Sequence, residues 1–251
     1  MSSINELTVL QFALIALGAA GIGFSKSGFT GVGMVHVIIF AFVFGARTST
    51  GILLPLLIVG DLCAVRMFGP QVQWKQIRRL MPPAILGVVL GWAMMSRLDE
   101  AVFKPLVGSI ILGLTSIQLA RMWRPRLFDQ LPHTRSFAWS LGLLAGVTTM
   151  LANAAGPIVA LFLLAVALPK YQLIGTSAWF FLVLNLLKVP FSAALGLIDF
   201  QSLILNAVLA PAVLLGMMAG RWLVQRVPQR LFDSLLLVFT AAAALRLITA
   251  P

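Results

Sequence analysis

The sequence predicts an all-α, polytopic membrane protein with about eight to ten transmembrane or re-entrant helices, and three observations lead to this prediction. The 251 residues are 60% hydrophobic, and their mean hydropathy is +1.02. Only 10% of them are charged, whereas a soluble domain carries about 25% charged residues. Apolar runs recur along the whole chain, and several approach the ~20 residues that cross a bilayer. A water-exposed surface cannot be built from so few polar groups, so a soluble fold is excluded.

The candidate membrane segments are roughly ten apolar runs, which glycine-rich or charged links separate. They cover 7–23, 33–45, 50–67, 80–96, 105–121, 136–151, 156–168, 173–196, 202–221 and 231–248. The runs at 33–45 and 156–168 are too short to cross a bilayer comfortably. Their length favours re-entrant or broken helices over full spans.

The distribution of basic residues predicts which links face the cytoplasm. The links at 66–79, 121–135 and 221–230 are rich in Lys and Arg, so the positive-inside rule places them in the cytoplasm. The links at 97–104 and 197–201 lack a basic excess and are expected to face outward. These assignments alternate along the chain and place both termini outside. Because the net charge of +11 resides largely in such links, it indicates a bilayer rather than a nucleic acid as partner.

An internal repeat relates the two halves of the chain. The matched positions, displaced by 123, 124 or 129 residues, are Gly23 with Gly146, Gly33 with Gly156, Gly51 with Gly175, Asp61 with Asn185, Gly91 with Gly220, Arg97 with Arg226 and Phe103 with Phe232. We therefore divide the chain into a first transmembrane repeat at 1–122, a basic cytoplasmic linker at 123–135 and a second transmembrane repeat at 136–251. Each repeat holds five segments, an odd number, so the two must have opposite orientations. Inverted repeats are typical of secondary transporters, whose substrate site lies at broken helices near the bilayer midplane.

Two glycine-rich interruptions, GFSKSGFTGVG at 23–33 and GVTTMLANAAGP at 146–157, predict the two sides of a binding site. Backbone in the bilayer core can leave the helix only where it is buried in protein or lines a wet cavity. The helix that resumes after such a break exposes N–H groups that favour an anion. Alternatively, the glycines only permit close helix packing. The candidate substrate-binding residues are Ser25, Lys26, Ser27, Gly28, Thr30, Gly31, Gly33, Thr149, Asn153, Gly156 and Thr176.

Charged residues at membrane depth are costly and usually functional. Lys26 could neutralise an anion or exchange a proton, or it could snorkel to the interface. Asp61 could carry protons, or it could be the structural partner of Lys26 or Arg66. Lys188 could attract an anion or snorkel, and Asn185 lies three residues earlier on the same helix face. We assign Asp61, Asn185 and Lys188 to proton coupling or charge partnership.

The remaining reactive residue types predict no catalytic or metal site. His36 could shuttle protons, but a hydrogen-bonded packing role is favoured for it. His133 lies in the basic central link, and Cys63 is expected to be a buried small hydrophobe. Two histidines and one cysteine offer no convincing metal site, and neither HExxH nor GxSxG is present. We therefore expect no metal, no cofactor and no enzymatic activity.

The interruptions and the runs beside them resemble the sulfite exporter TauE/SafE family, also called the toluenesulfonate uptake permease family. The matching pieces are GFSKSGFTGVG and LLPLLIVGDLCAV in the first half, and TTMLANAAGP and GTSAWFFLVLNLLKVPF in the second. The similarity covers nearly the whole chain. It implies a multi-pass transporter of the cell membrane, in bacteria the inner membrane, that moves sulfite, sulfonates or related organosulfur anions by alternating access. A homodimer would be compatible with this function. The alternatives are a membrane-embedded enzyme or accessory subunit, or an anion channel.

Overall fold

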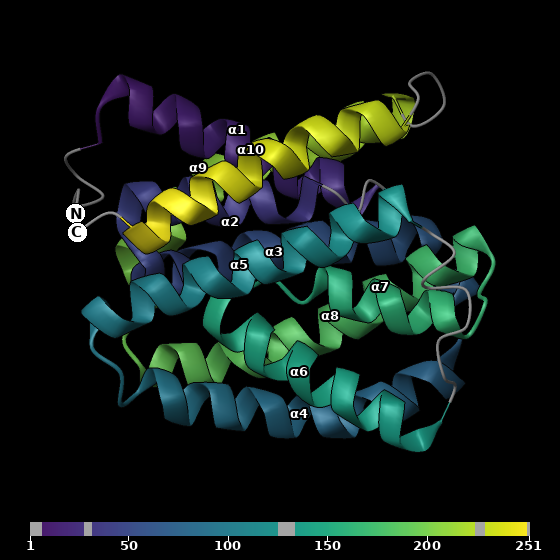
Figure 1. The fold of residues 1–251 in the computed structure, drawn as a ribbon. Coiled ribbons are helices and arrows are strands. Elements are labelled where there is room, and N and C mark those ends of the chain that lie inside the picture. The colour runs from purple at the N-terminus through teal and green to yellow at the C-terminus, as the bar shows by residue number, and fades with distance from the viewer. Residues whose placement is uncertain (1–6, 28–31, 125–133, 224–228, 250–251) are drawn as a thin grey trace.

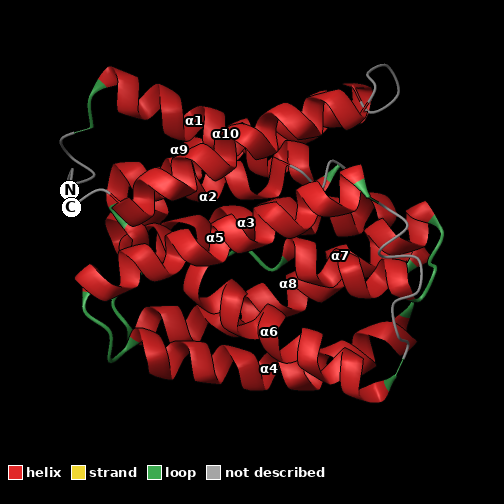
Figure 2. Cartoon of the chain, in the orientation of Figure 1, coloured by secondary structure: helices red, strands yellow, loops and turns green. Residues whose placement is uncertain are grey.

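The computed structural model describes residues 7–27, 32–124, 134–223 and 229–249, and these ranges are helical with short links and no strand (Figure 2). The α-helices are α1 (Val9–Lys26), α2 (Val35–Phe44), α3 (Ala46–Phe68), α4 (Trp74–Met95), α5 (Glu100–Trp123), α6 (Arg135–Ala152), α7 (Gly156–Ala165), α8 (Lys170–Ala194), α9 (Phe200–Leu223) and α10 (Gln229–Thr249). Short 3₁₀ helices at Val32–Met34 and Gly69–Gln71 precede α2 and follow α3. The predicted all-α class is confirmed.

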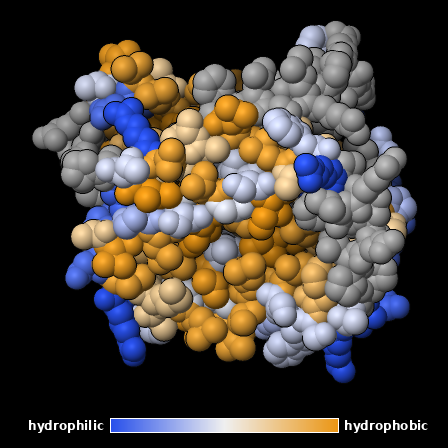
Figure 3. Space-filling model, viewed as in Figure 1, coloured by the Kyte–Doolittle hydropathy of each residue, from blue (hydrophilic) through white to orange (hydrophobic). Residues whose placement is uncertain are grey.

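Six of the helices are long and apolar enough to cross a membrane, namely α1, α3, α4, α5, α8 and α9. The visible surface shows the corresponding pattern, with hydrophobic side chains across the middle and hydrophilic ones toward the left and right edges (Figure 3). Large apolar side chains such as Leu215, Met218 and Phe200 are exposed on these helices. Such a belt suits lipid and not water, so the chain is a multi-pass membrane protein.

The two short helices α2 and α7 have ten residues each. At 1.5 Å per residue they are about 15 Å long, roughly half of the hydrocarbon core. The breaks before them have local causes. Asn153 ends α6 in the left-handed conformation, with φ of 51°, which Asn adopts more readily than most residues. Pro157 then lies in the first turn of α7, where its missing N–H leaves no helical hydrogen bond unmade.

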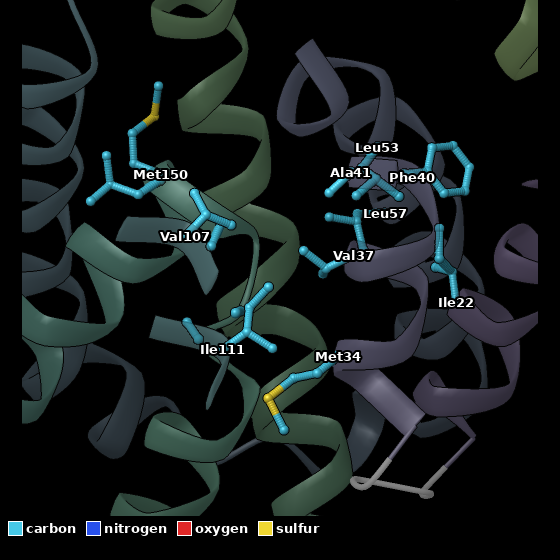
Figure 4. Close-up of a cluster of buried hydrophobic side chains, with 14 of the residues drawn as sticks. Ile22, Met34, Val37, Phe40, Ala41, Leu53, Leu57, Val107, Ile111 and Met150 are labelled. Atoms are coloured by element: carbon cyan, nitrogen blue, oxygen red, sulfur yellow. The ribbon is translucent and has the colours of Figure 1, made fainter. Parts of the chain in front are cut away.

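Apolar packing fixes the position of α2 (Figure 4). Its buried residues Val37 and Phe40 lie in one apolar cluster with Ile22 of α1 and with Leu53 and Leu57 of α3. Met34, just before α2, is also buried and accepts a weak hydrogen bond from the Thr115 hydroxyl of α5. The start of α2 is therefore held by three neighbouring helices.

Helices α3 and α8 pack against each other in antiparallel fashion at the centre of the molecule. Gly51, near the start of α3, lies against the carbonyl of Leu197 just beyond the end of α8. Gly175, near the start of α8, lies against the carbonyl of Phe68 at the end of α3. The second contact is the counterpart of the first in the repeat. Gly51 and Gly175 are 124 positions apart in the sequence, and Phe68 and Leu197 are 129 positions apart.

The outer helices repeat their contacts with the same displacements. Gly23 of α1 lies against the carbonyl of Val213 in α9, and Gly146 of α6 lies against the carbonyl of Ala84 in α4. A side chain on either glycine would overlap that carbonyl, so close packing explains Gly23 and Gly146. In the same way, Gly216 of α9 lies against the carbonyl of Ala20 in α1, and Gly87 of α4 lies against the carbonyl of Leu143 in α6.

These repeated contacts relate the two halves by an approximate two-fold axis, with opposite orientations. Counterparts α5 and α10 lie side by side, and in Figure 1 α5 runs from left to right whereas α10 runs from right to left. The arrangement is the inverted five-segment repeat that the sequence predicts. The exact boundaries at 122, 123, 135 and 136 stay predictions, since residues 125–133 of the linker lie outside the described residues.

Candidate functional site

A cavity of about 120 Å³ lies between the two breaks and is lined by α1, α2, α3, α6, α7 and α8. A buried water needs roughly 10–15 Å³ of such volume, so the cavity can hold a small anion. Seven of the predicted site residues are part of its lining, namely Ser25, Lys26, Gly33, Thr149, Asn153, Gly156 and Asn185. The two interruptions, far apart in the sequence, thus meet at one cavity.

Gly33 and Gly156 are counterparts in the repeat, and both line the cavity. A Cβ atom built on either glycine meets no heavy atom within 4 Å, in contrast to the tightly packed Gly23 and Gly146. Gly156 is the first residue of α7, and Gly33 lies in the 3₁₀ turn that precedes α2. The N-terminal ends of both short helices are therefore beside the cavity, where their unpaired N–H groups favour negative charge.

Lys26 is the last residue of α1 and lies on the cavity wall. Its Nζ forms an ion pair with Asp61 Oδ1 of α3 at 2.6 Å and lies 4.6 Å from the centroid of the Phe181 ring. The Asp61 side chain is fully buried, while that of Lys26 is 16% exposed. Among the alternatives that the sequence left open, the structure therefore shows Asp61 paired with Lys26 and not with Arg66.

Lys188 of α8 is buried beside the same cluster, with 1% of its surface exposed. Its Nζ donates to the Thr149 carbonyl at 2.8 Å, to Asn153 Oδ1 at 2.5 Å and, more weakly, to Asn185 Oδ1 at 3.4 Å. Asn185 Nδ2 in turn donates to Asp61 Oδ2 at 2.7 Å. Lys188 therefore points into the protein interior and does not snorkel.

The two asparagines connect the parts of the site. Asn153 Nδ2 donates to the Thr50 carbonyl of α3 at 2.9 Å while its Oδ1 accepts from Lys188. Asn185 likewise donates to Asp61 and accepts from Lys188. Each amide nitrogen thus faces an acceptor and each amide oxygen faces a donor, so the orientation of both groups is consistent. One Nδ2 hydrogen of Asn153, a cavity residue, is left for a ligand.

His36 lies in the first turn of α2 and lines the cavity. It is 2% exposed, and neither ring nitrogen has a hydrogen-bond partner among the described residues. The hydrogen-bonded packing role favoured from the sequence is thus not found within the described ranges. An unpaired buried polar group costs about 1–3 kcal/mol, which a ligand in the cavity could recover.

Other predicted residues lie away from the cavity lining. The Ser27 hydroxyl donates to the Phe24 carbonyl at 2.7 Å, and the Thr176 hydroxyl accepts from the Gln73 backbone N–H at 2.9 Å. Asp61 and Lys188 contribute to the cluster without lining the cavity. Gly28, Thr30 and Gly31 lie outside the described residues.

The sequence analysis missed the apolar side of the cavity. Its residues are Leu57, Ala64, Ala160, Leu173, Ile174, Ala178 and Phe181. In the sequence they resemble any other member of an apolar run, so no signal separated them from lipid-facing positions. Ser177 was also missed, although it adjoins Thr176 within the matched GTSAWFF stretch.

Comparison with protein-family models matches residues 14–247 to the family described as Sulfite exporter TauE/SafE. The matched range includes both breaks, the Lys26–Asp61 ion pair and Lys188. No curated protein matches the chain.

Proposed function

The chain belongs to the sulfite exporter TauE/SafE family, and from this premise we propose that it is a secondary transporter of small sulfur-containing anions. Its substrate is sulfite, a sulfonate or a related organosulfur anion, and it works by alternating access around the two breaks. It acts in the lipid bilayer of a bacterial inner membrane, as a monomer or a homodimer. Membership of a transporter family also speaks against an enzyme.

The observation that carries this proposal is that Lys26 both lines the cavity and forms an ion pair with the buried Asp61. An ammonium has three N–H donors, so the ion pair with Asp61 does not exhaust its capacity to bind an anion in the cavity. At ~4 Å and an effective dielectric constant near 20, the attraction amounts to about 4 kcal/mol before desolvation. The net gain is smaller, because both ions lose water.

Contacts from both halves support a role in transport as well as in binding. Lys26 and Gly33 belong to the first repeat, whereas Thr149, Asn153 and Gly156 belong to the second. A substrate in the cavity would therefore touch both repeats at once. A movement of one repeat against the other would then change the access to a substrate that stays near the centre.

Counterflow of radiolabelled sulfite in proteoliposomes tests the proposal. A transporter gives saturable uptake that unlabelled sulfite on the opposite side accelerates. Flux that rises linearly with concentration and shows no counterflow would instead indicate a channel. If neither sulfite nor methanesulfonate crosses the membrane faster than in empty liposomes, the proposed function is wrong.

Side chains that fill the cavity from the two helix N-termini should strongly reduce transport. Both Gly33→Leu and Gly156→Leu place a side chain in open space beside the lining, so we expect the fold to persist and counterflow to fall roughly tenfold or more. Gly113→Leu is the matched control, because Gly113 of α5 also faces open space but is exposed away from the cavity. Wild-type counterflow in both cavity variants at normal abundance would place the substrate elsewhere.

A further inference from the structure

The ionised side chains beside the cavity carry a net charge of +1. Two ammonium groups, Lys26 and Lys188, accompany one carboxylate, Asp61. Lys26 is paired with Asp61, and Lys188 is joined to Asp61 through Asn185, so the two lysines come from α1 and α8 and the carboxylate from α3. His36 of α2 lines the same cavity and is counted as neutral, the main form of an ordinary imidazole at pH 7.

The surroundings of Lys188 favour its charged ammonium form. The Thr149 carbonyl, Asn153 Oδ1 and Asn185 Oδ1 can only accept hydrogen bonds, and all three face its Nζ together with the Thr149 hydroxyl oxygen. An ammonium has three hydrogens to donate, whereas a neutral amine would have two and would turn a lone pair toward an oxygen. Since these contacts use its donors, Lys188 supplies charge to the cavity without touching a ligand.

We propose that this net charge makes the cavity selective for singly charged anions, with Asp61 as the residue that sets the selectivity. A singly charged anion brings the buried cluster to neutrality. A doubly charged one leaves an uncompensated negative charge, which is costly at membrane depth. The helix N-termini contribute dipoles and no net charge, so they stabilise both kinds of anion. The inference rests on the proposed function and narrows its substrate to hydrogensulfite or an organic sulfonate, with sulfate and the sulfite dianion disfavoured.

Asp61 is the position at which we test the inference, because its counterpart in the second repeat is an asparagine. Its counterpart Asn185 carries an amide of nearly the same shape, and the two side chains are hydrogen-bonded to each other. Asp61→Asn would therefore change little volume but would raise the net charge of the cluster by one. The preference should then move toward a doubly charged anion.

Methanesulfonate and sulfate are suitable probes, since both are tetrahedral about sulfur and they differ by one unit of charge. We would titrate each against the thermal stability of the purified protein, which reports binding without any need for transport. The wild type should be half-saturated at a roughly tenfold lower concentration of methanesulfonate than of sulfate. In Asp61→Asn the ratio of the two half-saturating concentrations should change in favour of sulfate by roughly tenfold or more. Asp99→Asn is the control, because Asp99 is exposed at the start of α5 and makes no side-chain capping bond.

Equal or tighter binding of sulfate by the wild type would overturn the inference, even if Asp61→Asn failed to fold. An unchanged ratio in a folded Asp61→Asn protein would also overturn it. Neither result touches the proposed function if sulfite counterflow is saturable. If no anion stabilises the wild type, this inference and the proposed binding site are both wrong.

Discussion

Lys26 and Lys188 share one polar cluster but have very different surroundings. Lys26 has one charged partner, Asp61, and lies on the cavity wall. Lys188 is enclosed by four oxygen atoms of Thr149, Asn153 and Asn185 and does not line the cavity. Their counterparts in the opposite repeat are Thr149 and Ala64, at displacements of 123 and 124, so neither charge is repeated by the symmetry. A nearly symmetric scaffold thus carries an asymmetric set of charges: one lysine lines the cavity, and the other is hydrogen-bonded to protein oxygens beside it.

The largest effect should follow from Lys188→Met, which removes the enclosed charge. The oxygens of Thr149, Asn153 and Asn185 would lose their donor in a buried place. Breaking a buried charged contact of this kind costs about 3–5 kcal/mol. We expect a strongly lowered melting temperature in detergent and little protein in the membrane. A melting temperature equal to that of the wild type would show that Lys188 does not stabilise the site.

The corresponding change at Lys26 separates a direct contact with the substrate from the effect of the cluster's net charge. Lys26→Met alone leaves the buried Asp61 carboxylate without its cation and should destabilise the protein by about 3 kcal/mol. Lys26→Met with Asp61→Asn removes both members of the ion pair, so stability should return toward wild type. The net charge of the cluster is then still +1, from Lys188.

If Lys26 touches the substrate, this double variant should fold and yet bind methanesulfonate roughly tenfold more weakly or worse. Thermal titration with methanesulfonate measures both properties in one experiment. Tight binding by the double variant would mean that net charge alone holds the anion, and Lys26 would then be no more than the partner of Asp61.

The sequence predicted the framework of the molecule well, because hydropathy and glycine spacing record local constraints. The apolar runs at 33–45 and 156–168 contain α2 and α7, and their shortness correctly indicated broken helices. The displacements between matched glycines recur as contacts in the structure, since each of Gly51 and Gly175 is required where another backbone approaches closely.

The partners of the charged residues could not be predicted in the same way. Asp61 was compatible with a proton carrier, with Lys26 and with Arg66, because the choice depends on how α1 and α3 cross. Lys188 has the sequence pattern of a snorkelling lysine, and only the position of α6 shows that Thr149 and Asn153 enclose it. The unpaired ring of His36 has no sequence signal, since it depends on which side chains are not nearby.

The smallest effect concerns the neighbours Thr176 and Ser177 on α8. The Thr176 hydroxyl accepts from the Gln73 N–H at the start of α4, whereas Ser177 lines the cavity. Thr176→Val keeps the shape of the side chain and removes only this acceptor, so we expect about 1 kcal/mol lower stability and unchanged methanesulfonate binding. Ser177→Val adds bulk to the cavity wall, so it should weaken binding severalfold while the melting temperature stays close to wild type. Both quantities come from the same thermal titrations. Weaker binding in Thr176→Val than in Ser177→Val would show that the substrate lies on the α4 side of α8, outside the cavity between the two breaks.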